Sequence, residues 1–256
     1  MATQSAQVIA FSTVELLESI LLHLDIQTLL TAQRTCRAWH ATIQGSTAIQ
    51  KALFFTPIDA SSASTKVQNP LLMKMFPSFF EWDPSLLASV DMLQRPEKLE
   101  AYIRPEASWR RMLVQQPPIL RIGVLLSSYA FAESHTFYEL STRHDGLMME
   151  EFFETFIFNR DIISLKFDTP ETVWWGATDS YAWLRMKELR GMTVETDLVV
   201  MIFGGATCTD FNGDGITEDV ILRDQIRGIY QKLNIRPRLP TDETRLNEWK
   251  YSKWYD

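Results

Sequence analysis

The stretch that decides the N-terminal fold is Phe11-Ser-Thr-Val-Glu-Leu-Leu-Glu-Ser-Ile-Leu-Leu-His-Leu24. It opens with the pattern of a capping box, in which Ser12 and Glu15 each bond the backbone amide of the other. Phe11 and Leu16 are spaced as a hydrophobic staple around this start. The stretch therefore predicts an amphipathic helix, and one stripe of it carries Leu16, Leu17, Ile20, Leu21 and Leu24.

Two further short helices are expected next. Asp25 is a suitable N-cap for a helix that carries Ile26, Leu29 and Leu30. Thr35 can cap a third helix, which Gly45 would end. The spacing of residues in this third helix places four of them on one face: Cys36, Trp39, His40 and Ile43.

Three such helices form a unit too small to bury all of these apolar side chains. Leu22 also lies opposite the main stripe of the first helix, which makes that helix apolar on more than one side. Surplus apolar surface of this kind docks against something. The alternatives are the rest of the chain, another protein, or both.

This segment resembles the F-box, whose pattern is LPxELLxxILxxLP, then xxLL, then VCRxWRxLI. The matching residues are 11–24, Leu29-Leu30 and Thr35-Cys-Arg-Ala-Trp-His-Ala-Thr-Ile43. Ser12 and Asp25 replace the two prolines of the family pattern. The resemblance implies a three-helix module that docks on the small Skp adaptor of a cullin–RING ubiquitin ligase. The adaptor-facing and core residues that it implies are Phe11, Leu16, Leu17, Ile20, Leu21, Leu24, Leu29, Leu30, Cys36 and Trp39.

The chain divides after this module. We expect a disordered N-terminus at 1–10, the F-box at 11–56, a Ser/Ala-rich linker or loop at 57–70, and an α+β domain for substrate recognition at 71–256. In that domain, apolar runs predict strands at Ile119–Leu126, Ile162–Phe167 and Leu198–Phe203. Helices are expected at Gly146–Phe158 (capped by Asp145), Ser180–Arg190 and Glu218–Leu233.

The phrase Arg104-Pro-Glu-Ala-Ser-Trp-Arg-Arg-Met-Leu-Val-Gln-Gln-Pro-Pro118 resembles segments of F-box proteins from filamentous fungi, whose C-terminal domains are of undefined function. Pro105 and Pro117-Pro118 suggest the start and end of a helix. We expect Arg110-Arg111 to be solvated or in salt bridges, with an acidic partner as the alternative. Glu150-Glu151 is expected to be solvated on a helix face.

Composition excludes several classes of protein. The 256 residues are 46% hydrophobic and 22% charged, with a net charge of −7, so nonspecific binding to nucleic acid or to an anionic membrane is not expected. Two distant cysteines give no disulfide framework. The first ten residues contain no basic side chain, so we expect no secretion signal there, and no apolar run is long enough to span a membrane. We therefore expect an intracellular protein, cytoplasmic or nuclear or both.

Enzyme motifs such as a phosphate loop, HExxH or CxxC are missing, and neither catalysis nor a cofactor is expected. Asp210-Phe-Asn-Gly-Asp-Gly-Ile-Thr-Glu218 places oxygen ligands at the spacing of a calcium loop, but Ile221 stands where the bidentate Glu of an EF-hand belongs. An ordinary turn is the favoured interpretation, and we expect no metal site.

Three hypotheses for function follow. The first is an F-box substrate receptor that binds the Skp adaptor, through it cullin, and an unknown protein target for ubiquitination. The second is an adaptor-binding scaffold outside the ligase. The third is a calcium-binding or enzymatic module in residues 71–256, which rests on the Asp210–Glu218 loop alone.

Overall fold

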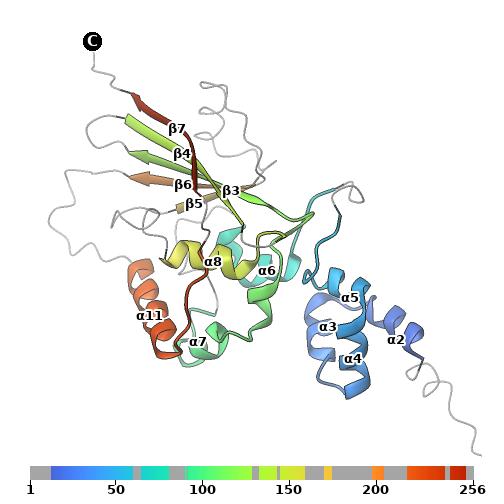
Figure 1. The fold of residues 1–256 in the computed structure, drawn as a ribbon. Helices are drawn as coiled ribbons and strands as arrows, with labels where there is room; N and C mark the ends of the chain where they lie inside the picture. The colour runs from blue at the N-terminus through green and yellow to red at the C-terminus, as the bar shows by residue number, and fades with distance from the viewer. Residues whose placement is uncertain are drawn as a thin grey trace, which may run out of the picture.

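The structure is a computed structural model, and it describes residues 13–59, 65–80, 90, 92–128, 133–142, 145–158, 170–174, 198–204, 218–239 and 243–251. It is α+β as expected, with an N-terminal group of helices followed by a domain of helices and sheets (Figure 1). The predicted strand at Ile162–Phe167 and helix at Ser180–Arg190 lie outside the described residues, as do residues 1–10 and 210–217.

Four short helices make up the N-terminal group: α2 (Val14–Leu21), α3 (Ile26–Ala32), α4 (Arg37–Gly45) and α5 (Thr47–Ala52). The sequence predicted the first three, and α5 was missed. Ser46 caps α5 by accepting a hydrogen bond from the Ile49 amide at 3.1 Å. A small core joins the helices, and its buried members are Leu17, Leu21, Leu29, Ala32, Ile43, Ile49 and Leu53.

Two of the predicted helix starts are wrong by one residue. The N-cap of α2 is Thr13 rather than Ser12, and the N-cap of α4 is Cys36 rather than Thr35; neither side chain makes a capping bond. The predicted cap of α3 is confirmed, because the Asp25 carboxylate accepts from the Thr28 amide at 3.0 Å and from its hydroxyl at 2.5 Å. As predicted, α4 ends at Gly45.

A five-stranded sheet organises the second domain. Its order is β5 (Pro170–Trp174), β6 (Leu198–Gly204), β3 (Arg121–Ser128), β4 (Glu133–Ser141), β7 (Glu243–Tyr251). β3 and β6 are parallel, and the other neighbouring pairs are antiparallel. The predicted strands at Ile119–Leu126 and Leu198–Phe203 correspond to β3 and β6.

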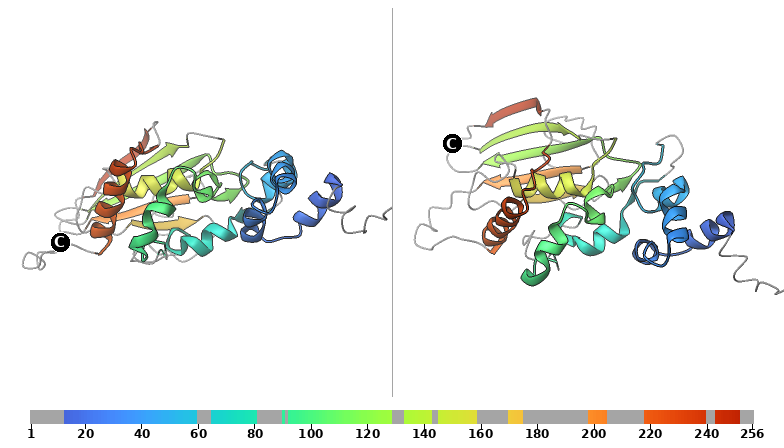
Figure 2. Two further views of the ribbon diagram at one scale, coloured as in Figure 1. Left: turned by 90° about the horizontal axis from the view of Figure 1, so that it is seen from below. Right: turned by 60° about the horizontal axis from the view of Figure 1, so that its bottom comes forward.

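Helices cover one face of this sheet (Figures 1 and 2). They are α6 (Pro70–Met75), α7 (Pro96–Ile103), α8 (Met149–Phe158) and α11 (Glu218–Lys232), with short 3-10 turns η2 (Pro77–Phe79) and η3 (Ser108–Arg111). The shared core is rich in aromatic rings that meet mostly edge to face, among them Phe76, Phe79, Trp109, Phe152, Phe153 and Phe156.

Three expectations for this domain need correction. The α8 helix begins at Met149, so Gly146 and Asp145 precede it and Asp145 is not its cap. The helix predicted between Pro105 and Pro117 is only the turn η3, because the chain is extended from Met112 and then forms a strand. The helix predicted at Glu218–Leu233 is α11, but Ile221 is exposed rather than packed with Leu222 and Ile226.

A joint connects the two parts of the chain. Within the predicted linker 57–70, β1 (Val67–Gln68) pairs antiparallel with β2 (Gln115–Gln116). The Gln116 side-chain amide donates to the carbonyls of Lys51 and Thr56, both at 3.0 Å. The N-terminal helices are therefore hydrogen bonded to the second domain just after α5.

No helix among the described residues has the length and apolar character needed to cross a membrane.

Candidate functional site

The feature that stands out on the N-terminal helices is exposed apolar surface on α2. Val14, Leu16, Ile20 and Leu22 are exposed to 57%, 50%, 41% and 40%. Among the described residues these are four of the seven large apolar side chains that face solvent. Figures 1 and 2 place α2 at the end of the molecule farthest from the sheet, where the second domain does not cover it.

The pattern of side chains on α2 explains this exposure. Leu17 and Leu21, one turn apart, are buried against the other helices. Leu16 and Ile20 lie one turn apart on one flank of that buried face. Val14 and Leu22 fall on the other flank. The predicted stripe is therefore wider than the small bundle can cover, and its edges remain in solvent.

A shallow apolar hollow of about 450 Å³ lies between α2 and α4. Val14 and Glu18 line it from α2, and the small side chains Ala38 and Ala41 line it from α4. The Ser46 hydroxyl donates a hydrogen bond to the Glu18 carboxylate at its edge. Small residues on α4 thus leave room beside Val14 for an apolar side chain of a partner.

The structure distributes the predicted adaptor-binding residues over three environments. Leu17, Leu21 and Leu29 are buried in the core, Leu24, Leu30 and Trp39 are partly buried against it, and Leu16, Ile20 and Cys36 are exposed. Phe11 lies outside the described residues. Val14 was not among the predicted adaptor-binding residues. Its apolar side chain lies outside the predicted stripe, and this position could have indicated that it is exposed.

Charged and titratable side chains border this surface, among them Glu18 at the edge of the hollow, His23 and Asp25. His23 is exposed, and its ring nitrogen Nδ1 lies 2.7 Å from the Ser19 carbonyl oxygen. The two hydrogen bonds from Thr28 lower the pKa of the Asp25 carboxyl below its ordinary value. Asp25 is therefore a charged cap at the start of α3, close in sequence to the end of α2.

A second notable site is a buried ion network in the other domain. Arg110 from η3 is buried, and its guanidinium donates to Glu150 and Glu154 of α8 with N···O distances of 2.5 Å. It also donates to the Tyr230 hydroxyl at 2.9 Å, and this hydroxyl donates to Glu154 at 2.9 Å. The expectation of a salt-bridged Arg110 is confirmed. The prediction that Glu150-Glu151 is solvated is wrong, since Glu151 is buried and Glu150 is ion-paired.

Burial sets the direction of the pKa shift for two members of this network, Glu154 and Tyr230. It raises the pKa of the Glu154 carboxyl, although the Arg238 amide, Arg110 and Tyr230 favour the ionised form. Burial also raises the pKa of the Tyr230 hydroxyl above its ordinary value. Burial acts to lower the pKa of Arg110, but Tyr230 and the two carboxylates outweigh it and raise that pKa. The network fixes η3, α8 and α11 together.

In the part of the chain that the structure describes, no three metal-binding side chains lie close enough together to hold a metal ion. The Asp210–Glu218 loop lies outside those residues except for Glu218, and its calcium site stays a hypothesis.

Comparison with known proteins identifies one part of the chain. The family model described as F-box-like matches residues 14–54, the segment that forms α2 to α5. No curated protein and no solved structure shows a significant match to the chain. The family match supports a role in binding a Skp-type adaptor of ubiquitin ligase complexes.

Proposed function

Because residues 14–54 form an F-box-like domain, we propose that this chain is a substrate receptor of a cullin–RING ubiquitin ligase. Its N-terminal helices bind the Skp-type adaptor, and its α+β domain binds a protein target. The chain has no catalytic step of its own in this proposal. It raises the effective concentration of the target near the ubiquitin-charged enzyme.

The observation that carries the proposal is the exposed apolar surface of α2. Side chains that are half exposed on a helix are unfavourable in water, and their burial in a partner's groove stabilises a complex. The α2 helix lies on the side of the N-terminal helices that is away from the second domain (Figure 1). An adaptor bound there leaves the α+β domain free to hold a target at the other end.

The decisive variant is Leu16→Asp/Ile20→Asp. Both side chains are exposed, so two carboxylates at these positions leave the bundle core intact and disrupt an apolar interface. Leu21 is fully buried, so Leu21→Asp would unfold the bundle and give no information about binding. An interface hot spot contributes about 2 kcal/mol to binding. Each of the two substitutions should therefore lower the affinity for a purified Skp-type adaptor at least roughly 30-fold. Calorimetry with the full chain measures this loss.

A matched control is Leu120→Asp/Ile221→Asp, which places the same charges at side chains of the second domain that are exposed to 59% and 48%. This control should bind the adaptor like the unmodified chain. Equal binding by both double variants, with unchanged melting temperatures, would remove the α2 surface from the proposal. Recovery of cullin with the adaptor in a pull-down supports the receptor, whereas adaptor without cullin contradicts the ligase part.

A further inference from the structure

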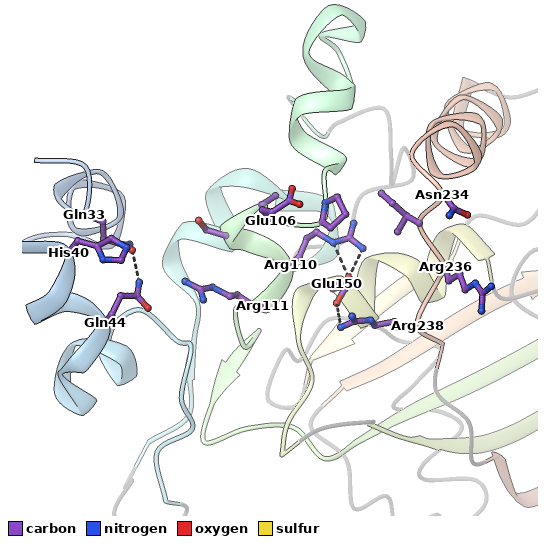
Figure 3. Close-up of a pocket in the computed structure, with 14 residues that line it drawn as sticks. Gln33, His40, Gln44, Glu106, Arg110, Arg111, Glu150, Asn234, Arg236 and Arg238 are labelled. Carbon is purple, nitrogen blue, oxygen red and sulfur yellow. Dashed lines mark hydrogen bonds and ion pairs between the residues drawn. The ribbon is translucent and has the colours of Figure 1, made fainter. Parts of the chain in front are cut away.

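A polar cleft of about 760 Å³ lies between the N-terminal helices and the second domain (Figure 3). Its volume is in the range of ligand-binding clefts. One wall is formed by Gln33 of α3 together with His40 and Gln44 of α4. The opposite wall comes from residues 105–111, Glu150 of α8, and the segment 234–238 after α11. The cleft therefore depends on both parts of the chain.

The charge of the cleft is opposite to that of the whole protein. Its lining includes four arginines (Arg110, Arg111, Arg236 and Arg238) against Glu106 and Glu150, an excess of two positive charges in a chain of net −7. Such a local excess of positive charge attracts negatively charged groups.

The buried ion network engages one of the two acidic residues of the lining, Glu150, whereas Glu106 is exposed and lies outside it. Glu150 already accepts from Arg110 and, at 3.4 Å, from Arg238. Glu154 accepts from Arg110 and from the backbone amide of Arg238. These carboxylates are thus paired within the wall of the cleft, and Arg111 and Arg236 lie on either side of the network rather than within it (Figure 3).

Two of the arginines are held in place by contacts that leave guanidinium hydrogen bonds available. The guanidinium carbon of Arg111 lies 4.0 Å from the centroid of the Phe55 ring, an arrangement in which the planar group stacks and its edge remains accessible. The backbone of Arg238 is tied to Glu154. Ordering these groups before binding reduces the entropy lost when a ligand binds.

We propose that this cleft binds an acidic segment of the target protein, through carboxylates or phosphate esters on its side chains. Arginine forms paired hydrogen bonds with both kinds of group. Gln44 and Asn234 offer further donors along the same cleft (Figure 3). The inference rests on the proposed receptor function for the identity of the ligand, and it assigns target recognition to the boundary between the two domains.

The test uses three fluorescein-labelled peptides of equal length, rich in glutamate, phosphoserine or glutamine. Fluorescence anisotropy measures their binding to the full chain. We expect one or both acidic peptides to bind and the glutamine peptide to bind far more weakly. Arg111→Gln/Arg236→Gln should reduce the affinity for the acidic peptide at least roughly tenfold, and added salt should reduce it further. The better of the two acidic peptides identifies the source of the charge.

The matched control is Lys74→Gln/Lys98→Gln, which removes the same net charge from exposed positions of α6 and α7 outside the cleft lining. This control should retain affinity within about twofold, because distant exposed charges are screened. An equal loss in both variants, equal binding of the glutamine peptide, or no binding of either acidic peptide would overturn the inference. Adaptor affinity measured on the same variants should be unchanged, which separates this test from that of the α2 surface.

Discussion

Gly146, in the bend that precedes α8, occupies a backbone position that only glycine fits. Its φ is +153°, and a Cβ atom there would lie 2.3 Å from the Pro118 Cβ and 2.9 Å from the Leu113 Cδ2. We predict that Gly146→Ala lowers the free energy of unfolding by about 2–4 kcal/mol, through backbone strain and overpacking. Urea denaturation of the full chain measures the change.

The contrasting residue is Gly228, inside α11, where an added Cβ meets no atom within 4 Å. Gly228→Ala should stabilise the protein by about 0.5–1 kcal/mol, because alanine loses less backbone entropy in a helix. Similar unfolding curves for the two alanine variants would contradict the close approach of Gly146 to Pro118.

At the scale of elements, the Arg110 network determines how η3 and α8 pack together. Replacing Arg110 with methionine leaves the buried Glu154 carboxylate and the partly buried Glu150 carboxylate without this cation. We predict a loss of about 3–5 kcal/mol at neutral pH, which urea denaturation measures. Lys232→Met is the matched control, because Lys232 and Glu100 are both exposed and form an ion pair at 2.6 Å, and the loss of this pair should cost at most about 1 kcal/mol.

The loss in Arg110→Met should depend on pH. Burial raises the pKa of Glu154 in the folded protein above its ordinary value of 4.5. Between the pKa of Glu154 in the unfolded chain and its higher pKa in the folded protein, the folded state holds a proton that the unfolded chain has released. The free energy of unfolding therefore falls as the pH rises from the lower of these two pKa values to the higher. Removing Arg110 raises this pKa further. The deficit relative to the unmodified protein should therefore be smaller near pH 5 than near pH 7, and Glu154→Gln in the same chain should remove the difference. A deficit independent of pH would contradict this assignment.

These elements also show what the sequence can predict. The cap at Asp25 and the helices α2 to α4 follow from side chains within one or two turns of one another, so local patterns were sufficient. The split of the α2 stripe into buried Leu17 and exposed Leu16 depends on the positions of the other helices. Likewise, Arg110 and Glu154 are 44 residues apart, and only the folded chain brings them together. The arginine cleft could not be predicted for the same reason.

At the scale of the whole molecule, the two domains share a hydrophobic boundary as well as hydrogen bonds. Phe55 packs against both cores, and the Leu113 amide donates to the Phe54 carbonyl at 2.8 Å. Removing residues 1–56 would expose this surface of the second domain. Point variants on α2 therefore test adaptor binding more cleanly than a truncated chain.

Gln116 provides the sharpest test of this coupling. Its side chain is buried, and one amide group donates to the carbonyls of both Lys51 and Thr56. Gln116→Met keeps the approximate volume but leaves two partly buried carbonyls without this donor, which we predict costs about 1–3 kcal/mol. Hydrogen exchange should accelerate in α5 more than in the β3 and β4 strands, because the lost bonds hold the end of the N-terminal helices. Gln44→Met, which removes an exposed bond to Gln33, should change neither quantity appreciably. Equal acceleration throughout the sheet and α5 would mean that the two domains unfold as one unit, independently of Gln116.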